Sequence, residues 1–545
     1  RPEREAEPTL PTPDLSHAPD MPFAPGVTRQ AGGYAVASGD VKLLVGGDGA
    51  LDQVTTSAGD TLARSGGIVF VEWPDRTTIG PAGAVTQMRA EVDSLRWDWA
   101  AADLSARHDL RAREGCVEWT ARVENLSDRP RLLEVRLALP VAMGEGPWNS
   151  WDGMKLSRVD ARTTDDEMTT LAPGGIASQG IFPAVCLSNE RVGLAMGMTP
   201  MHIESFYGSR LAPATGGLET WYYAVRWALP PGGQRAARFV IYATDPQWSW
   251  RSAVQRYWSL WPEVFAAPER DDIWGLYASA SPSGIHNQGD TFIERCRRLR
   301  VGGMELYAPF NQTGDFYPDD EPAYVRKDGA VTLSREQMRD AEQTANVASC
   351  NISYVIPTKC ERELAKSTFA DSVIRCLDGS MFLLDHWDVM GGGREKLAGM
   401  NALRNSYETS LHREVMQIVD NYAPDGFYFD NGAYLWQDYG REGEWAAFDD
   451  DGNVYTNAGI AYAVLQDMLA ERAPQIHRNP GEHIQYFSGF RGNSHLTNNT
   501  GGQKYYVRSH RLIMGYKPIF PGHPRNIVSR SMLYDYLEFG GLPWL

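Results

Sequence analysis

The period of the apolar residues changes near residue 250, and this change divides the chain between two kinds of fold. Before that point apolar and polar residues alternate, as they do over 117–123 and again over 133–139. Such alternation predicts strands with one buried face, and the turn at 125–130 predicts that these two form a hairpin. After residue 272 short apolar runs alternate with helical patterns, which predicts a parallel sheet. We therefore predict a multidomain protein of the β plus α/β class, in which a large antiparallel β-sandwich precedes a (β/α)8 TIM-type barrel.

The same patterns set the expected domain boundaries. The first 30 residues are rich in Pro, Glu and Asp and show no period. Between Val254 and Trp261, apolar residues recur at helical spacing, and Pro262 disturbs that pattern. The expected segments are a flexible lead-in at 1–30, the β-sandwich at 31–247, a linking helix and linker at 248–272, and the catalytic barrel at 273–545.

Six short apolar runs are candidate strands of the barrel. Six strands over about 250 residues indicate most of an eightfold barrel. The count falls short of eight, so either a strand such as Met381–Asp385 is missed, or the barrel is incomplete at its C-terminus or closes irregularly. The candidate strands are Trp274–Ala278, Met304–Ala308, Ile352–Ile356, Gly426–Phe429, His483–Phe487 and Lys517–Phe520.

One of these runs ends abruptly in a carboxylate. A helical pattern stops at Pro424, the buried run Phe427–Phe429 follows, and Asp430 and Asn431 come next. Active sites of β/α-barrels lie at the carboxyl ends of the strands, so we predict that Asp430 is catalytic. Aromatic residues such as Trp436 crowd the following loop, and such rings often stack on sugar rings. The alternative is that Asp430 only caps the next segment or binds backbone amides.

A glycoside hydrolase usually needs a second carboxyl group, one that donates a proton to the leaving group. Asp385 and Asp388 are our first candidates, because Phe382–Leu384 resembles a buried strand that ends in an acid. Beside the apolar ring of Trp387, a carboxyl group can keep its proton through desolvation. Each such acid is also consistent with a loop cap or a salt bridge. Further candidates are Asp315, Asp319, Asp320, Glu321, Glu361, Glu363, Asp535 and Glu538.

Polar residues follow the third, fifth and sixth candidate strands. Lys359 and Arg362 follow the third, Arg491 follows the fifth, and His523 follows the sixth. These groups can bind sugar hydroxyls or a substrate carboxylate, although structural ion pairs explain them equally well. The predicted substrate-binding residues are Asn311, Asp315, Lys359, Glu361, Arg362, Trp387, Asn431, Trp436, Arg491 and His523.

Charge and composition exclude several functions. The net charge of −17, with no lysine- or arginine-rich run, argues against nucleic-acid binding. No apolar run approaches the roughly 18–20 residues that span a bilayer. The six cysteines show no metal-binding spacing and fit either disulfides or buried thiols. The acidic run at 449–453 lacks the terminal glutamate of a calcium loop, so we read it as a solvated turn. We predict no metal and no cofactor.

The start of the chain bears on its location. It begins with Arg1 rather than Met, so we expect a processed or trimmed chain. A polar, aperiodic lead-in often follows a removed export signal, which predicts a secreted or periplasmic protein.

Three segments resemble a group of glycoside hydrolases that includes the melibiase-type α-galactosidases, α-glucosidases with an N-terminal sandwich, and endo-α-N-acetylgalactosaminidases. Residues 122–130 resemble a strand-turn-strand of their galactose-mutarotase-like sandwich, and 253–258 resemble their linking helix. Residues 426–431 resemble their fourth barrel strand, which ends in the nucleophilic aspartate. The resemblance implies a hydrolase of α-linked oligo- or polysaccharides with Asp430 as nucleophile.

One departure from that group keeps two other functions open. The group places its acid/base on a later strand or loop, whereas 488–492 and 521–524 contain no carboxylate here. Together with Lys359, Arg362, Arg491 and His523, this suggests a carbohydrate lyase or an enzyme acting on modified or acidic sugars. A non-catalytic sugar-binding protein is the third alternative, since a barrel alone does not establish chemistry.

Overall fold

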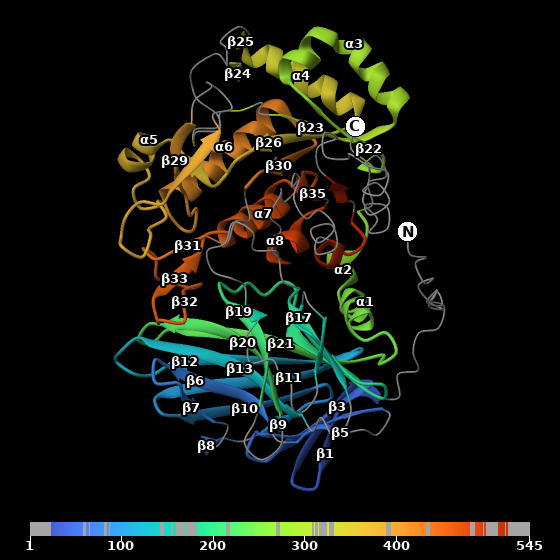
Figure 1. Cartoon of the computed structure of the whole chain (residues 1–545), viewed down its shortest axis with the longest axis vertical. Helices are drawn as coiled ribbons and strands as arrows, with labels where there is room; N and C mark the ends of the chain where they lie inside the picture. The colour runs from blue at the N-terminus through green and yellow to red at the C-terminus, as the bar shows by residue number, and fades with distance from the viewer. Residues whose placement is uncertain are drawn as a thin grey trace, which may run out of the picture.

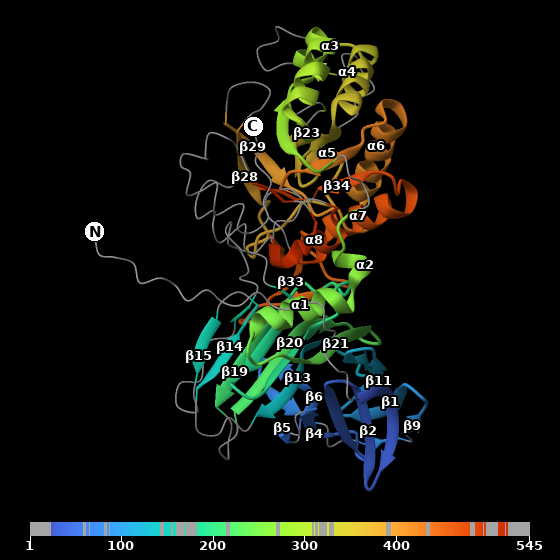
Figure 2. The ribbon, with the colours of Figure 1, turned by 90° about the vertical axis from the view of Figure 1, so that its right-hand side faces the viewer.

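A computed structural model describes most of the chain from Phe23 to Pro521. The residues that it does not describe within that range are 58–60, 65, 81–83, 87, 142–146, 154–155, 160–168, 171–181, 214–218, 269–272, 308–309, 311–313, 315–323, 326–331, 388–393, 432–435, 480–485, 494, 498–510 and 518. Two domains are stacked along the long axis of the molecule, and helices α1 and α2 lie between them (Figures 1 and 2).

The N-terminal domain contains two large antiparallel sheets. In order across the first sheet lie β1 (Phe23–Gln30), β2 (Gly33–Gly39), β3 (Val41–Gly46), β4 (Leu51–Thr56), β5 (Thr61–Arg64), β13 (Arg131–Val141), β20 (Glu219–Leu229), β19 (Tyr207–Pro213) and β16 (Thr169–Thr170), with β6 (Gly67–Trp73) beside β13 and β7 (Thr77–Ile79) beside β6. In order across the second lie β15 (Leu156–Val159), β14 (Trp148–Trp151), β17 (Ala184–Ser188), β18 (Gly193–Met198), β21 (Gln234–Thr244), β12 (Cys116–Asn125), β11 (Leu104–Arg113), β10 (Ser94–Ala101) and β8 (Ala84–Val85), with β9 (Arg89–Ala90) beside β10.

Large aromatic side chains fill the core of this domain. Trp119 and Trp227 are buried, and the Trp97 ring stacks on His108 at a centroid distance of 4.9 Å. Trp119 Nε1 donates a hydrogen bond to His108 Nδ1 at 3.2 Å, so the imidazole is an acceptor there. Burial lowers the pKa of His108 to about 3 and keeps it neutral at ordinary pH. The predicted antiparallel sandwich is therefore present, with a neutral histidine inside its aromatic core.

The predicted hairpin at 117–139 is wrong. β12 and β13 both show the expected alternation, but β12 pairs with β11 and β21, whereas β13 pairs with β20 and β6. The turn at 125–130 therefore carries the chain from one sheet to the other. Alternation identifies a strand and its buried face, but it does not identify the strand's partner.

The predicted linking helix is confirmed as α1 (Trp250–Leu260), and α2 (Pro262–Phe265) follows it directly. Tyr257 is fully buried, and its hydroxyl donates to the carbonyl of Met198 in the sandwich at 2.7 Å. Trp258 Nε1 donates to the carbonyl of Leu512 in the barrel domain at 3.0 Å. The helix thus joins the two domains through one aromatic side chain on each side.

The C-terminal domain is built on parallel strands that alternate with helices, as predicted. The elements are β22 (Leu276–Ala280), α3 (Pro282–Leu299), β23 (Val301–Leu306), α4 (Arg335–Ala348), β26 (Cys350–Val355), α6 (Ser406–Tyr422), β30 (Gly426–Phe429), α7 (Ile460–Arg472), β34 (His477–Asn479), α8 (Tyr486–Arg491), β35 (His495–Thr497) and β36 (Ile519–Pro521). Strands β22, β23, β26, β30 and β34 form one parallel sheet in chain order, and β35 and β36 form a further parallel pair.

The fifth strand lies earlier in the chain than predicted. We expected a strand at His483–Phe487, but helix α8 begins at Tyr486 and the strand is β34. A short apolar run fits a buried helix as well as a buried strand. β34 reads His-Arg-Asn and carries no apolar signal, so its pairing with β30 alone makes it a strand.

Three small antiparallel sheets interrupt the barrel pattern. The first pairs β24 (Tyr324–Val325) with β25 (Thr332–Leu333). The second contains β27 (Lys359–Cys360), β28 (Leu383–Trp387) and β29 (Arg394–Gly399), and the short helix α5 (Arg362–Ser367) lies between β27 and β28 in the chain. The third contains β31 (Gln437–Asp438), β32 (Ala447–Phe448) and β33 (Val454–Asn457). The proposal that Met381–Asp385 is a missed barrel strand is wrong, because β28 pairs antiparallel with β29. We call β27, β28 and β29 the first excursion sheet, and β31, β32 and β33 the second.

The second excursion sheet and its loops also contact the sandwich. The amide of Ala228 in β20 donates to the carbonyl of Ala446 at 3.0 Å. Arg226 pairs with Asp450 at 2.8 Å, and Ser205 Oγ donates to the carbonyl of Trp445 at 2.5 Å. Because this sheet follows β30 directly, the sandwich contacts the barrel through the connection that begins at Asp430.

Within the described residues, no helix is long and apolar enough to cross a bilayer.

Candidate active site at the carboxyl end of β30

Asp430 lies directly after β30, on the strand face that points into the barrel. All four residues of β30 are buried. Phe429 packs against Tyr462 of α7 at a centroid distance of 5.3 Å, so it faces the helices. Tyr428 instead packs with Tyr354 in a separate cluster inside the barrel, 5.3 Å between ring centroids. Since side chains alternate along a strand, Asp430 shares the inward face of Tyr428.

Three side chains hold the Asp430 carboxylate. The hydroxyl of Tyr354, on the neighbouring strand β26, donates to Oδ2 at 2.5 Å. Asn431 Nδ2 donates to the same oxygen at 2.6 Å. The hydroxyl of Tyr428 reaches Oδ1 at the longer distance of 3.4 Å. Oδ2 therefore has two short hydrogen bonds, and Oδ1 has one weak hydrogen bond.

Opposing effects act on the protonation of Asp430. Burial raises its pKa, because only 8% of the residue is exposed. The hydrogen bond from Tyr354 and the positive charge of Lys359 act in the other direction and favour the carboxylate form. Burial is the larger effect, so the pKa of Asp430 is raised overall, while the donors and Lys359 oppose that rise.

The backbone after Asp430 turns sharply and is fixed by residues at the end of β26. Asn431 has a φ of 56°, in the left-handed region that asparagine tolerates better than most residues. The hydroxyl of Thr358 donates to the carbonyl of Asn431 at 3.0 Å. The amide of Asp430 donates to the carbonyl of Val355 at 2.9 Å. These bonds link the end of β26 to the end of β30 and set the position of the carboxylate.

Two residues of the second barrel strand belong to this site and were missed in the sequence. Tyr307 follows β23, and its ring lies 5.1 Å from that of Tyr354. Burial first, and then Glu305 and Asp430, raise the pKa of Tyr307 to about 12. Glu305 is 2% exposed and pairs with Ile352 on the inward face. A charged residue inside the buried run Val301–Leu306 was the available signal.

The polar residues expected after the third strand have different roles. Lys359 is buried in β27 and acts electrostatically on Asp430. Glu361 instead caps helix α5, since its carboxylate accepts from the amides of Glu363 at 2.9 Å and Leu364 at 2.7 Å. Arg362 is the first residue of α5 and is exposed. Lys359 is thus brought to the site, while Glu361 serves as the loop cap that we considered as its alternative.

Trp436 and Arg491 make contacts of a structural kind. Trp436 is 9% exposed and packs against Phe382 at a centroid distance of 5.2 Å. Arg491 lies in helix α8 rather than at the end of a strand, so its predicted placement is wrong. It pairs with Asp467 of α7 at 2.7 Å. The error follows from reading α8 as a strand.

The other predicted site residues are described in part or not at all. Asp385 and Trp387 lie in strand β28, and their side chains are outside the described part of the structure. Asn311, Asp315, Asp388 and His523 lie outside the described residues, as do Asp319, Asp320, Glu321, Asp535 and Glu538. Their roles stay predictions.

The described residues hold no group of three or more His, Cys, Asp or Glu side chains suited to a metal ion. All six cysteines are free thiols, and five are buried, which decides between the two states considered above. Burial raises the pKa of the Cys116 and Cys186 thiols to about 12, so these two are unreactive.

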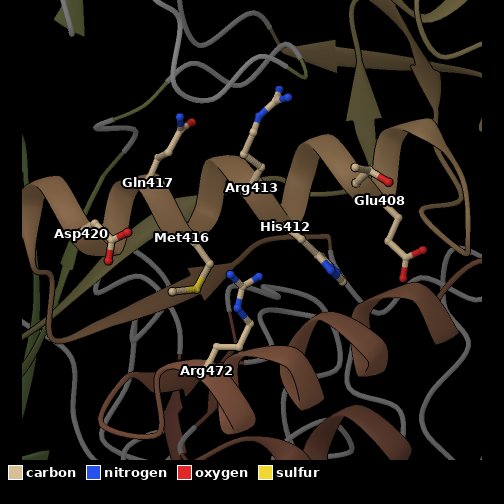
Figure 3. Close-up of a pocket in the computed structure, with 8 residues that line it drawn as sticks. Glu408, His412, Arg413, Met416, Gln417, Asp420 and Arg472 are labelled. Atoms are coloured by element: carbon tan, nitrogen blue, oxygen red, sulfur yellow. The ribbon is translucent and has the colours of Figure 1, made fainter.

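A groove of about 570 Å³ lies elsewhere, on the outer helical wall between α6 and α7 (Figure 3). Figure 3 shows Arg472 of α7 pointing toward Met416 and His412 of α6. Burial, and secondarily Arg472, lower the pKa of His412 to about 4. This groove does not include Asp430 or its partners. Its lining residues are Glu408, Thr409, His412, Arg413, Met416, Gln417, Asp420 and Arg472.

No known family profile matches this sequence, and no curated protein matches it. Solved structures do match the fold. The GH36 α-galactosidase AgaB of Geobacillus stearothermophilus aligns with a TM-score of 0.63 at 12% identity, over 95% of this chain and 83% of its own. The galactosidase domain of the α-galactosidase–sucrose kinase AgaSK aligns with a TM-score of 0.62 at 8% identity, over 95% and 82%. A variant of α-galactosidase AgaA of G. stearothermophilus, solved with stachyose, aligns with a TM-score of 0.57 at 13% identity, over 91% and 72%.

These matches confirm the predicted architecture. The three alignments cover at least 91% of this chain, so they span the sandwich, the linking helices and the barrel together. The expected resemblance to melibiase-type glycoside hydrolases therefore holds at the level of the fold.

Proposed function

We propose that this protein is a glycoside hydrolase that cleaves α-linked sugars, with Asp430 as the catalytic nucleophile. One observation carries the proposal. A buried carboxylate follows the fourth strand of the barrel sheet and is held by Tyr354 and Asn431. In a fold shared with α-galactosidases, this is the end of the barrel at which catalytic groups lie.

The hydrogen bonds distinguish the two oxygens of Asp430. Oδ2 accepts from Tyr354 and Asn431 at 2.5 and 2.6 Å, so it is fixed. Among the side-chain hydrogen bonds of the described residues, Oδ1 takes part in the long 3.4 Å contact with Tyr428, and we assign it as the attacking atom. Oδ1 forms a bond to the anomeric carbon while the glycosidic C–O bond breaks and the leaving oxygen takes a proton from an acid. Water, deprotonated by that same group, then breaks the new ester bond and releases the sugar.

Asp385 and Asp388 remain our candidates for the acid. β28, which contains Asp385, belongs to the first excursion sheet, and that sheet begins at Lys359. Because Lys359 acts on Asp430, this sheet approaches the nucleophile from the third strand. An acid beside Trp387 would keep its proton through desolvation and could donate it to the leaving group.

The substrate class follows from the matched fold. Stachyose occupies the AgaA variant, and we extend that ligand class, an α-linked oligosaccharide, to this chain. The polar contacts at Asp430 and the rings of Tyr307 and Tyr354 are consistent with a sugar-binding site.

A hydrolysis screen tests the proposal. The intact protein is incubated with aryl α- and β-glycosides and with α-linked oligosaccharides, beside Asp430→Asn and the matched control Asp425→Asn. Asp425 precedes the same strand at its other end, where it accepts from the amide of Asn351 at 3.0 Å, a bond that asparagine preserves. We expect α-glycoside hydrolysis by the intact protein and the control, and a loss of roughly 10⁴-fold or more in Asp430→Asn.

Three outcomes would replace the proposal with another function. Equal turnover by a folded Asp430→Asn moves the active site elsewhere. Unsaturated sugar products establish a lyase. Binding of sugars without turnover across the panel establishes a sugar-binding protein.

A further inference from the structure

A second groove, of about 420 Å³, lies where the sandwich meets the second excursion sheet. We call it the junction groove and define it by Arg122, His202, Glu204, Arg235, Arg238 and Trp445. Its residues come from strands β12 and β21, from the segment after β18, and from the connection between β32 and β31. Asp430 and its partners are not among them.

Two exposed arginines of the groove lie on one face of the sandwich. Arg122 of β12 pairs with Ala236 of β21, and Thr120 pairs with Arg238. Residues paired across antiparallel strands point to the same face, so the two arginines are diagonal neighbours, roughly 7–8 Å apart at their backbones. Both are exposed, and among the described residues no carboxylate lies within ion-pair distance of either.

The neighbouring arginine on this face has its own partner. Arg107 lies directly opposite Arg122, and it pairs with Asp98 at 2.9 Å. Arg122 therefore lies between Arg107, which Asp98 neutralises, and Arg238. Glu124 of the same strand shares its face, and Asp109 is its diagonal neighbour on β11. In a chain of net charge −17, the lining of this groove holds three arginines, Arg122, Arg235 and Arg238, against two glutamates, and this excess of positive charge points to an anionic ligand.

The acidic groups of the groove are already occupied. Glu204 is 1% exposed, and its carboxylate accepts from Trp227 Nε1 at 3.0 Å and from Arg235 Nη2 at 2.5 Å. His202 Nε2 lies 2.9 Å from the same carboxylate. Glu444, also in the lining, pairs with Arg404. Neither acid is left to neutralise Arg122 or Arg238.

An aromatic wall completes the groove. Trp445 lines it, and the Arg404 guanidinium lies 5.2 Å from the Trp445 ring centroid. The adjacent Met201 is 49% exposed. A flat ring beside two arginine forks suits a ligand with an apolar ring face and a carboxylate or sulfate group.

We propose that the junction groove is a second binding site for an acidic carbohydrate, in which Arg122 and Arg238 bind a carboxylate or sulfate ester and Trp445 contacts the sugar ring. The carbohydrate identity of the ligand rests on the proposed function. The second excursion sheet connects this groove to Asp430, because residues 431–459 run from one to the other.

The proposal is tested by calorimetric titration of the intact protein and of Asp430→Asn. The ligands are an oligogalacturonide, a sulfated galacto-oligosaccharide and a neutral galacto-oligosaccharide. Arg122→Gln/Arg238→Gln removes the two charges. Arg29→Gln/Arg89→Gln removes two exposed sandwich charges of β1 and β9 as a matched control.

We expect an acidic oligosaccharide to bind the intact protein, Asp430→Asn and the control alike, and to bind more weakly as salt rises. The groove variant should lose about tenfold or more in affinity. Binding of the oligogalacturonide identifies the anionic group as a carboxylate, and binding of the sulfated oligosaccharide identifies it as a sulfate. Equal binding by the groove variant, equal binding of the neutral ligand, or no binding of either acidic ligand overturns the proposal. Groove binding without glycoside hydrolysis would overturn the proposed function alone, and hydrolysis without groove binding would overturn this inference alone.

Discussion

The hydroxyl of Tyr354 lies 2.5 Å from Oδ2 of Asp430, although 75 residues separate them in the chain. The register of the parallel sheet produces this contact, because Tyr354 of β26 pairs with Tyr428 of β30 on the inward face. The long side chain of Tyr354 reaches past the end of its own strand to Asp430, two residues beyond its partner Tyr428. The orientation of the carboxylate is therefore set by a neighbouring strand rather than by its own loop.

Tyr354→Phe should move the acidic limb of the pH profile of kcat/KM to higher pH. The lost hydrogen bond favours the carboxylate, so its removal raises the pKa of Asp430 further. A hydrogen bond to a charged group of this kind corresponds to roughly ten- to hundredfold in kcat/KM. The measurement is kcat/KM between pH 4 and 8.

Tyr428→Phe is the matched control, since it removes only the 3.4 Å contact to the other oxygen. Its acidic limb should shift less. An unchanged acidic limb in Tyr354→Phe would show that this hydroxyl does not act on the titrating group.

Lys359→Met should shift the same limb in the same direction. The ammonium group lowers the pKa of Asp430, and a neutral side chain of similar length removes that effect. Lys366→Met, on the exposed face of α5, should leave the profile unchanged. If both lysine variants behave alike, the charge of Lys359 does not act on Asp430.

The protein should become less stable as pH rises, because Glu342 loses its proton in that range. This buried carboxyl of α4 accepts from Ser353 Oγ at 2.8 Å and from Asn351 Nδ2. Burial raises its pKa from 4.5 to about 8, so the folded state binds the proton more tightly than the unfolded chain does. The stabilisation is complete below pH 4.5 and is lost as pH rises through about 8.

Glu342→Gln removes this titration. The fall in melting temperature between pH 5 and pH 8 should become smaller, by an amount that corresponds to roughly 3–4 kcal/mol. Glu471→Gln, an exposed position of α7, serves as the control. An identical fall in Glu342→Gln and the intact protein would mean that Glu342 does not carry the pH dependence.

Arg235 and Glu204 should behave as a coupled pair at the domain junction. Arg235 also donates to the carbonyl of Ala446 at 2.7 Å, so it links the sandwich to the barrel domain. Arg235→Met leaves the carboxylate of Glu204 buried with one cation fewer, which should cost about 3 kcal/mol. Arg235→Met/Glu204→Gln should recover part of that loss in a thermal unfolding scan. Additive losses in the double variant would contradict the coupling.

The sequence predicted best where one local pattern decides the structure. The position of Asp430 at the end of a buried strand was predicted correctly because a helix end, a buried run and a carboxylate follow one another in the chain. The contacts of Tyr354 and Glu305 were not predicted, because they depend on the register between strands, which no local pattern encodes. Strand β34 was not predicted for the same reason, since its three polar residues form a strand only through their pairing with β30. The hairpin at 117–139 failed because alternation does not say in which sheet a strand lies.

The most direct test of the central claim is covalent trapping of the nucleophile. The protein is treated with an activated fluorosugar of the type that it hydrolyses, which forms the glycosyl-enzyme quickly and releases it slowly. Peptide mass spectrometry then locates the added sugar. We predict that the label lies on the peptide that contains Asp430, and that Asp430→Asn takes up none. A label on another carboxylate, with Asp430 unmodified, would contradict the account.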